Sequence, residues 1–325
     1  MRKKGKIAAL IVSASLLVAG LAIAALGVAF MWKNSHFLSK NTLKSETVDV
    51  TEEVGSINVL ATTCDVIFEV SPDGSSYVSA FIPEKCELEA HVTDNVLHVN
   101  VKDTRKWYDH IGISFGTDSP NVVIYMPKGE YEDLTVDVTT GDLKTSEDHS
   151  FTSLSFEAST GDAVIFSPVK ELLVANVTTG DVTVDNTSPS LMEIKATTGD
   201  VKIQHVSNSG KITAKTGSGD ITLSSIRSNE LDIKTTTGDI TLNDVIAAEI
   251  TQVETTSGDV SLTAFDSKAI YIDVTTGDVT GELLSGKTFT TDTTTGDIRV
   301  PYSTEGGVCN IKTTTGDIII TLTNP

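Results

Sequence analysis

Ten aspartates recur along the chain at nearly constant spacing, each directly after the glycine of a Thr/Ser-Gly-Asp tripeptide. Carboxylates repeated in this way can bind Ca²⁺ between stacked coils. The second glycine and the further ligands of that calcium-binding pattern are missing here. We therefore expect each aspartate to accept hydrogen bonds from turn N–H groups, with at most a weak, diffuse association with cations. The ten residues are Asp142, Asp162, Asp181, Asp200, Asp220, Asp239, Asp259, Asp278, Asp297 and Asp317.

Stacking these carboxylates one coil apart would have a measurable cost. Two of them about 4.8 Å apart in water repel by roughly 0.9 kcal/mol before salt screens the interaction. Summed over neighbouring pairs, the repulsion becomes comparable with the stability of a whole domain. The sequence thus predicts a stability that responds to cations such as Ca²⁺, without a dedicated metal site or a cofactor.

The other reactive residue types form no recognisable catalytic set. The chain has no nucleophile elbow, HExxH motif, phosphate-binding glycine loop or Cys/His pairing motif. The threonines before each glycine can form a hydroxyl surface for ice or carbohydrate, although Thr also simply favours strands. We expect no enzymatic activity. The alternative is a carbohydrate-active enzyme, a polysaccharide lyase or hydrolase on a β-helix, which needs two carboxylates roughly 5–10 Å apart in a groove.

Three cysteines cannot all pair within one chain. Cys309 stands at an apolar position of the repeat and is expected to be a buried thiol. Cys64 and Cys86 can form one disulfide or remain two thiols, and the sequence leaves both open.

The net charge of the chain restricts the class of partner. Twenty-four basic against 44 acidic residues give a net charge of −20, which excludes a nucleic-acid partner because phosphate binding requires clustered Lys and Arg.

The elements that position these residues follow from the repeat. The ten glycines lie 19 or 20 residues apart, and apolar residues alternate with Thr, Lys, Asp and Ser on both sides of each. Alternation at period two predicts a strand with one buried face. Each repeat is therefore a strand, a tight turn, a strand and a turn. The Thr-Thr-Gly-Asp corner suits a type II turn, in which glycine adopts a positive φ.

These strands can form an antiparallel meander or a parallel stack. Every copy presents the same residue types in the same columns, so stacking like on like is favoured. We expect an all-β parallel β-solenoid of about 19–20 residues per coil, with ten regular coils over residues 131–325. A degenerate copy, with Cys64 in place of the glycine, lies close to four repeat lengths before Gly141. Residues 47–130 are then either irregular coils or a separate strand-rich cap.

The first 46 residues predict a location. Residues 1–6 are basic, and residues 7–32 are an uncharged apolar run, which exceeds the ~20 residues that span a bilayer. The run is also longer than the apolar region of a cleaved signal peptide, although cleavage near Ala22–Ala25 stays open. We expect a cytoplasmic tail over 1–6, a transmembrane signal-anchor helix over 7–32, a polar stalk over 33–46 and the remainder outside the cytoplasm.

Several features resemble the bacterial domain family labelled "putative adhesin": the strands at 55–62 and 95–101, the Tyr-Met-Pro sequence ending at Pro127, and the serial Thr-Gly-Asp coils. The resemblance covers about residues 48–322. It implies a single-pass protein of the bacterial cell membrane whose extracytoplasmic β-solenoid serves adhesion, envelope scaffolding or sensing. Expected partners are the membrane, an envelope glycan or protein ligand, and a second copy bound through the C-terminal coil, which would end the stack uncapped.

Overall fold

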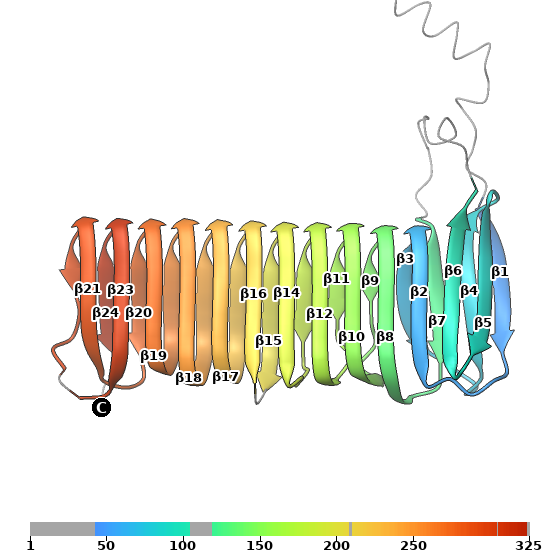
Figure 1. Ribbon diagram of the computed structural model, residues 1–325, viewed down its shortest axis with the longest axis horizontal. Helices are drawn as coiled ribbons and strands as arrows, with labels where there is room; N and C mark the ends of the chain where they lie inside the picture. The colour runs from blue at the N-terminus through green and yellow to red at the C-terminus, as the bar shows by residue number, and fades with distance from the viewer. Residues whose placement is uncertain (1–42, 105–118, 208–209, 304, 324–325) are drawn as a thin grey trace, which may run out of the picture.

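The computed structural model describes residues 43–104, 119–207, 210–303 and 305–323, and every regular element in these ranges is a β-strand. Figure 1 shows the strands side by side in one elongated stack, and their parallel pairing confirms the all-β solenoid. The expected basic tail, signal-anchor and most of the stalk lie outside the described residues. Within the described ranges, no helix is long and apolar enough to cross a membrane. The first strand begins at Leu43, inside the expected stalk.

Strands β1–β7 form the N-terminal part of the sheet: β1 (Leu43–Val50), β2 (Ser56–Thr63), β3 (Asp65–Val70), β4 (Ser76–Pro83), β5 (Cys86–Thr93), β6 (Val96–Asp103) and β7 (Asn121–Met126). The repeats form the remaining strands, with β17, β18 and β19 each running from one coil into the next. These strands are β8 (Gly129–Thr140), β9 (Leu143–Lys144), β10 (His149–Thr160), β11 (Ala163–Ile165), β12 (Val169–Thr179), β13 (Val182–Asp185), β14 (Leu191–Thr198), β15 (Val201–Ser207), β16 (Lys211–Ser218), β17 (Ile221–Thr237), β18 (Ile240–Ser257), β19 (Val260–Thr276), β20 (Val279–Leu283), β21 (Lys287–Thr295), β22 (Ile298–Arg299), β23 (Gly307–Thr315) and β24 (Ile318–Leu322).

Equivalent positions of neighbouring coils pair in register. Leu154 of β10, for example, pairs with Leu134 of β8 and with Leu173 of β12. The inward side chains are almost fully buried and form one continuous apolar core along the stack. Because one coil cannot bury its own apolar face, each coil depends on its neighbours. The outward side chains alternate with the core residues and remain accessible for contacts.

The close approach of successive corners explains why glycine recurs in the repeat. The corner glycines have φ angles between 140° and 153°. These angles are positive as predicted, but they are far from the roughly 80° of a type II turn, so that turn assignment is wrong. A Cβ on Gly161 would lie 2.0 Å from the carbonyl oxygen of Gly141 in the preceding coil. Glycine is therefore required by the stacking of backbones as well as by φ.

At the N-terminal end the chain leaves the stack and returns to it. Thr63 of β2 pairs with Thr140 of β8, and β3 pairs with β9, so the degenerate copy at Cys64 lies directly against the coil of Gly141. The intervening strands β6 and β7 extend the stack in parallel, and β5, β4 and β1 then pair antiparallel. Among the described residues, no coil lies between the two copies. The segment instead combines one further pair of parallel strands, β6 and β7, with the antiparallel strands β1, β4 and β5.

The C-terminal end contains a second departure from chain order. Strand β23 pairs with β19 on one side and with β21 on the other, and β24 lies between β20 and β22. The coil of Gly316, which is last in the sequence, is thus inserted between the coils of Gly277 and Gly296. Figure 1 shows β21 at the end of the stack, beyond β23. The coil expected to be exposed at the tip is therefore internal.

The inward side chains of the last two coils explain this order. Cys309 and Ile311 of β23 are fully buried, whereas Phe289 and Thr291, at the same positions of β21, stay partly exposed. Placing the aliphatic coil inside and the threonine-rich coil at the end removes more apolar surface from water. The end strand also carries the buried Lys287, and charged residues of this kind discourage pairing with a further strand.

Candidate functional site

The ten aspartates form one continuous ladder. In nine of them, all but Asp142, the backbone N–H donates to Oδ1 of another of the ten aspartates, in the preceding coil of the stack, at 2.7–2.8 Å. The ladder follows the stack rather than the sequence, because Asp317 donates to Asp278 and Asp297 donates to Asp317. The carboxylates accept N–H groups as expected, but from the neighbouring coil instead of their own turn.

The first rung of the ladder is Asp65, whose Oδ1 accepts the N–H of Asp142 at 3.0 Å. Partial burial raises the pKa of the Asp65 carboxyl. The hydrogen bond from Asp142 opposes this shift, and the charge of Asp142 adds to it. Among the described residues, no group of three or more His, Cys, Asp or Glu side chains is placed to hold a metal ion. Weak cation association along the ladder stays a prediction.

Threonines that interrupt the apolar columns stabilise the corners. The hydroxyl groups of Thr216, Thr235 and Thr313 donate to the carbonyl oxygen of the glycine in the preceding coil, at 2.9–3.1 Å. A buried hydroxyl that donates to a buried carbonyl satisfies both polar groups. These threonines are therefore structural, and the hydroxyl groups available to a ligand belong to a separate, outward column.

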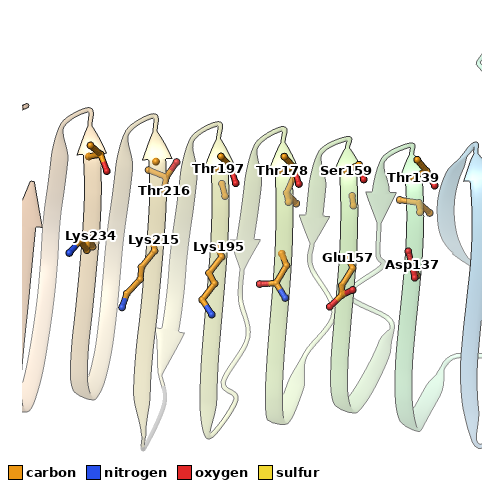
Figure 2. Close-up of a pocket in the computed structure, with 17 residues that line it drawn as sticks. Asp137, Thr139, Glu157, Ser159, Thr178, Lys195, Thr197, Lys215, Thr216 and Lys234 are labelled. Carbon is orange, nitrogen blue, oxygen red and sulfur yellow. The ribbon is translucent and has the colours of Figure 1, made fainter. Parts of the chain in front are cut away.

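The long strands present one outer face, and a shallow groove crosses it over β8, β10, β12, β14, β16 and β17. We call this the central groove. Figure 2 shows one row of hydroxyl-bearing side chains near the strand ends, formed by Thr139, Ser159, Thr178 and Thr197. The row below it changes charge along the axis, through Asp137, Glu157, Lys195, Lys215 and Lys234. Asn176 pairs in register between Glu157 and Lys195.

The lysines of the central groove are already paired within the protein. Lys215 Nζ lies 2.8 Å from Asp232, and Lys234 Nζ lies 2.6 Å from Glu254. Lys195 contacts the glutamate two residues before it. Burial alone would raise the pKa of Asp232, but the hydrogen bonds and charges of Lys215 and Lys211 together outweigh burial and lower that pKa. The positive charge of the groove is thus largely neutralised before any ligand arrives.

A second groove lies on the same face nearer the C-terminal end, and we call it the distal groove. Its largest side chain is Tyr271, which is 40% exposed. The parallel pairing places Gln252 on one side of Tyr271 and Asn310 on the other. Two residues further along the same strands, a second row completes the lining with Glu254, Asp273 and Lys312.

The distal groove depends on the inverted order of the last two coils. Tyr271 of β19 pairs with Asn310 of β23, whereas stacking in chain order would place Thr290 of β21 beside it. The sequence does not reveal this groove, because the outward columns carry no repeated residue type. The one available signal is an aromatic residue, Tyr271, at an outward position of a predicted strand.

The distal groove also differs from the central one in its unpaired side chains. Among the residues that the structure describes, no hydrogen bond or ion pair involves the side chains of Gln252, Tyr271, Asp273, Asn310 or Lys312. Four of the five are exposed and Asn310 is half-buried. Their donors and acceptors face solvent and are free to bind an incoming group.

A third groove along the shorter strands contains an Asp-His pair, with His205 Nδ1 2.8 Å from Asp185. Such a pair serves hydrolases when a serine hydroxyl lies against the other ring nitrogen. Ser225 occupies the equivalent position of the next coil, but its hydroxyl bonds to Asp244. Within the described residues, this groove therefore presents a pair rather than a catalytic triad.

All three cysteines are buried thiols, and none of them forms a disulfide. The expectation for Cys309 is confirmed, and of the two alternatives for Cys64 and Cys86 the structure has two thiols. Burial raises the pKa of Cys64 and of Cys309 to about 12. Because the thiolate is the reactive form, neither residue is suited to nucleophilic chemistry.

Residues 54–214 and 208–325 match the family model described as Toastrack DUF4097. The chain belongs to this family. No curated protein matches it. The family match confirms the resemblance seen in the sequence. Solved structures named "putative adhesin" are among those similar to this Toastrack chain.

One such structure is a "putative adhesin" from Bacteroides fragilis, at 15% identity and a TM-score of 0.41, covering 87% of this chain and 100% of the other. Another, from Parabacteroides distasonis, has 12% identity and a TM-score of 0.43, with 85% and 96% covered. A "putative lipid binding protein" from Parabacteroides distasonis has 11% identity and a TM-score of 0.28, with 86% and 97% covered.

Proposed function

We propose that this Toastrack protein is a non-enzymatic surface protein of the bacterial cell membrane. Residues 7–32 anchor it, and the solenoid outside the cytoplasm presents its long outer face to a ligand, in adhesion, envelope scaffolding or sensing. One observation carries the proposal. The Gly-Asp corners recur in every regular coil and the inward columns stay mostly apolar, whereas the outward columns change charge and size within a few coils. A varied face on a uniform scaffold suits recognition.

A carbohydrate-active enzyme is the second candidate, because carboxylate pairs occur in both grooves. Glu157 pairs in register with Asp137, and Glu254 with Asp273. Neighbouring strands lie about 4.8 Å apart, which is close to the roughly 5–5.5 Å between the carboxyl groups of retaining glycosidases. All four carboxylates are exposed, however, and catalytic acids of this type lie in desolvated surroundings. Their exposure favours binding over hydrolysis.

Membrane location and orientation test the main proposal. In bacteria that express the full chain, we expect it in the membrane fraction, with residues from 43 onward degraded by protease added to intact cells or spheroplasts. A variant without residues 7–32 serves as the control and should stay in the soluble fraction, protected from that protease. A full chain that remains soluble, or that resists external protease until the cells are lysed, would overturn the proposal.

A reducing-end assay separates the two candidates. The full chain should release no new reducing ends or unsaturated products from soluble polysaccharides over many hours. Release that disappears in both Glu254→Gln and Asp273→Asn would instead establish the enzyme.

A further inference from the structure

We infer that the distal groove binds a neutral pyranose glycan, with the ring of Tyr271 as the platform for a sugar ring. The inference rests on the proposed function, for which it names the class of ligand. It starts from the row in which Gln252 and Asn310 flank Tyr271, and from the adjoining row of Glu254, Asp273 and Lys312.

The arrangement matches the two surfaces of a sugar. A pyranose ring has a face of C–H bonds and a rim of hydroxyl groups. The C–H face packs on the electron-rich face of an aromatic ring. The rim hydroxyls bond to amides, which offer a donor and an acceptor in one plane, and to carboxylates, which offer two acceptors in one plane. Gln252 of β18 and Asn310 of β23 pair with Tyr271 from the two neighbouring strands, so amide groups are available for hydroxyls on both edges of one sugar.

The free state of these side chains favours the distal groove over the central one. A hydroxyl that bonds to Gln252, Asp273 or Asn310 replaces water, because these groups have no partner among the described residues. A ligand in the central groove would have to separate ion pairs such as that of Lys234 with Glu254. The central groove also contains no aromatic side chain among its lining residues, so it offers no stacking platform.

Charge decides which glycans fit. The chain has a net charge of −20, and the groove adds no net positive charge, since Glu254 is paired with Lys234 and the carboxylate of Asp273 balances the ammonium group of Lys312. A polyanion would therefore be repelled at long range. An uncharged polysaccharide is not repelled and can use the polar groups as hydrogen-bond partners.

Affinity electrophoresis of the full chain tests the inference. The protein is kept in a polyoxyethylene detergent, whose headgroup carries no sugar, and native gels contain dextran, mannan, hydroxyethyl cellulose or dextran sulfate. We expect retardation by at least one of the three neutral polymers and none by dextran sulfate. Tyr271→Ala should weaken the binding about tenfold or more. Tyr271→Phe, which keeps the ring, should retain it. Thr135→Ala, an exposed position of the same column on β8, is the matched control and should bind like the unchanged chain.

Several results would overturn the inference: no retardation by any neutral polymer, retardation by dextran sulfate, or equal binding by Tyr271→Ala and the unchanged chain. Melting temperatures of all variants should agree, since an exposed ring adds little to the core. The proposed function is tested separately. If the chain lies outside the cytoplasm but binds no neutral polymer, only the glycan inference is rejected.

If the chain is soluble but binds a polymer through Tyr271, only the proposed surface location is rejected.

Discussion

The central and distal grooves lie on one face of one solenoid, yet they offer a ligand different surfaces. Coils in chain order form the central groove, and its lysines are held by neighbouring carboxylates. Coils out of chain order form the distal groove, where polar side chains without partners surround Tyr271. The scaffold fixes where outward side chains stand. The identity of the neighbouring coil then decides whether they pair with each other or stay free to bind.

If the scaffold is shared, corner glycines under both grooves should be equally indispensable. In Gly219→Ala and Gly316→Ala the new Cβ would lie 2.1 and 2.0 Å from the carbonyl oxygen of the preceding glycine. Backbone strain and overpacking, each about 1–3 kcal/mol, predict a loss of roughly 2–6 kcal/mol in the free energy of unfolding. Denaturant titration measures it. Gly129→Ala, whose Cβ meets nothing within 4 Å, is the control, and corner variants as stable as this control would contradict the stacking.

The order of the last two coils predicts the next largest effect. Ile311 is fully buried in β23, while Thr291 stands at the same position of the end strand β21 and is partly exposed. Ile311→Ala should therefore cost about 2–5 kcal/mol, and Thr291→Ala less than about 1 kcal/mol. Thermal or chemical unfolding compares them. Equal losses would mean that β23 is not internal.

The aspartate ladder runs along the corners of the coils that form both grooves, and one rung can be changed in two ways. Asp200 Oδ1 accepts the N–H of Asp220 at 2.8 Å. Asp200→Ala removes the acceptor and should cost about 1 kcal/mol. Asp200→Asn keeps an oxygen acceptor and relieves repulsion between neighbouring carboxylates, so it should be as stable as the unchanged chain or slightly more stable at low salt. If Asn and Ala destabilise equally, the negative charge itself is required. Added Ca²⁺ should raise the melting temperature of the unchanged chain.

The smallest expected effects are pH dependences of opposite sign. The lysines of the central groove lower the pKa of Asp232 from its usual 3.8. The Asp232 carboxylate therefore stabilises the fold fully above pH 3.8. This contribution to stability is lost as pH falls through the lower pKa of the folded state. The pKa of Asp65 is raised from 3.8, so its contribution to stability decreases as pH rises from that value through the folded pKa. At pH 7, Asp232→Asn should lose up to about 1 kcal/mol and Asp65→Asn should gain slightly. Unfolding titrations from pH 2.5 to 7 check both signs.

The coil and its register were predictable because they are local and repeated. Columns such as Leu134, Leu154 and Leu173 specify an inward face, and the Gly-Asp corner marks each coil. The order of the coils was not predictable in the same way, since copies with one common pattern can stack in any sequence with the same register. The remaining signal lies in the inward columns, where Thr291 stands at the position that Ile311 fills in the next copy. A threonine there predicts a coil at the end of the stack.

The candidate site was less predictable than the fold. The aspartate column was found because it repeats, and the structure shows it to be a hydrogen-bonded ladder. The distal groove combines Gln252, Tyr271 and Asn310 from three coils, two of which are not consecutive. Side chains that differ from coil to coil leave no periodic trace, so only the three-dimensional order brings these residues together.

Disulfide trapping tests the coil order that builds the distal groove most directly. Cα atoms of paired residues on adjacent strands lie within the roughly 4.4–6.8 Å that a disulfide spans, and residues two coils apart do not. Asp273 pairs with Lys312, and Lys312 pairs with Asp292. Under mild oxidation, the full chain carrying Asp273→Cys and Lys312→Cys should form an internal disulfide, identified by mass spectrometry of the linked peptides. The chain carrying Asp273→Cys and Asp292→Cys should not, and the reverse result would contradict the account.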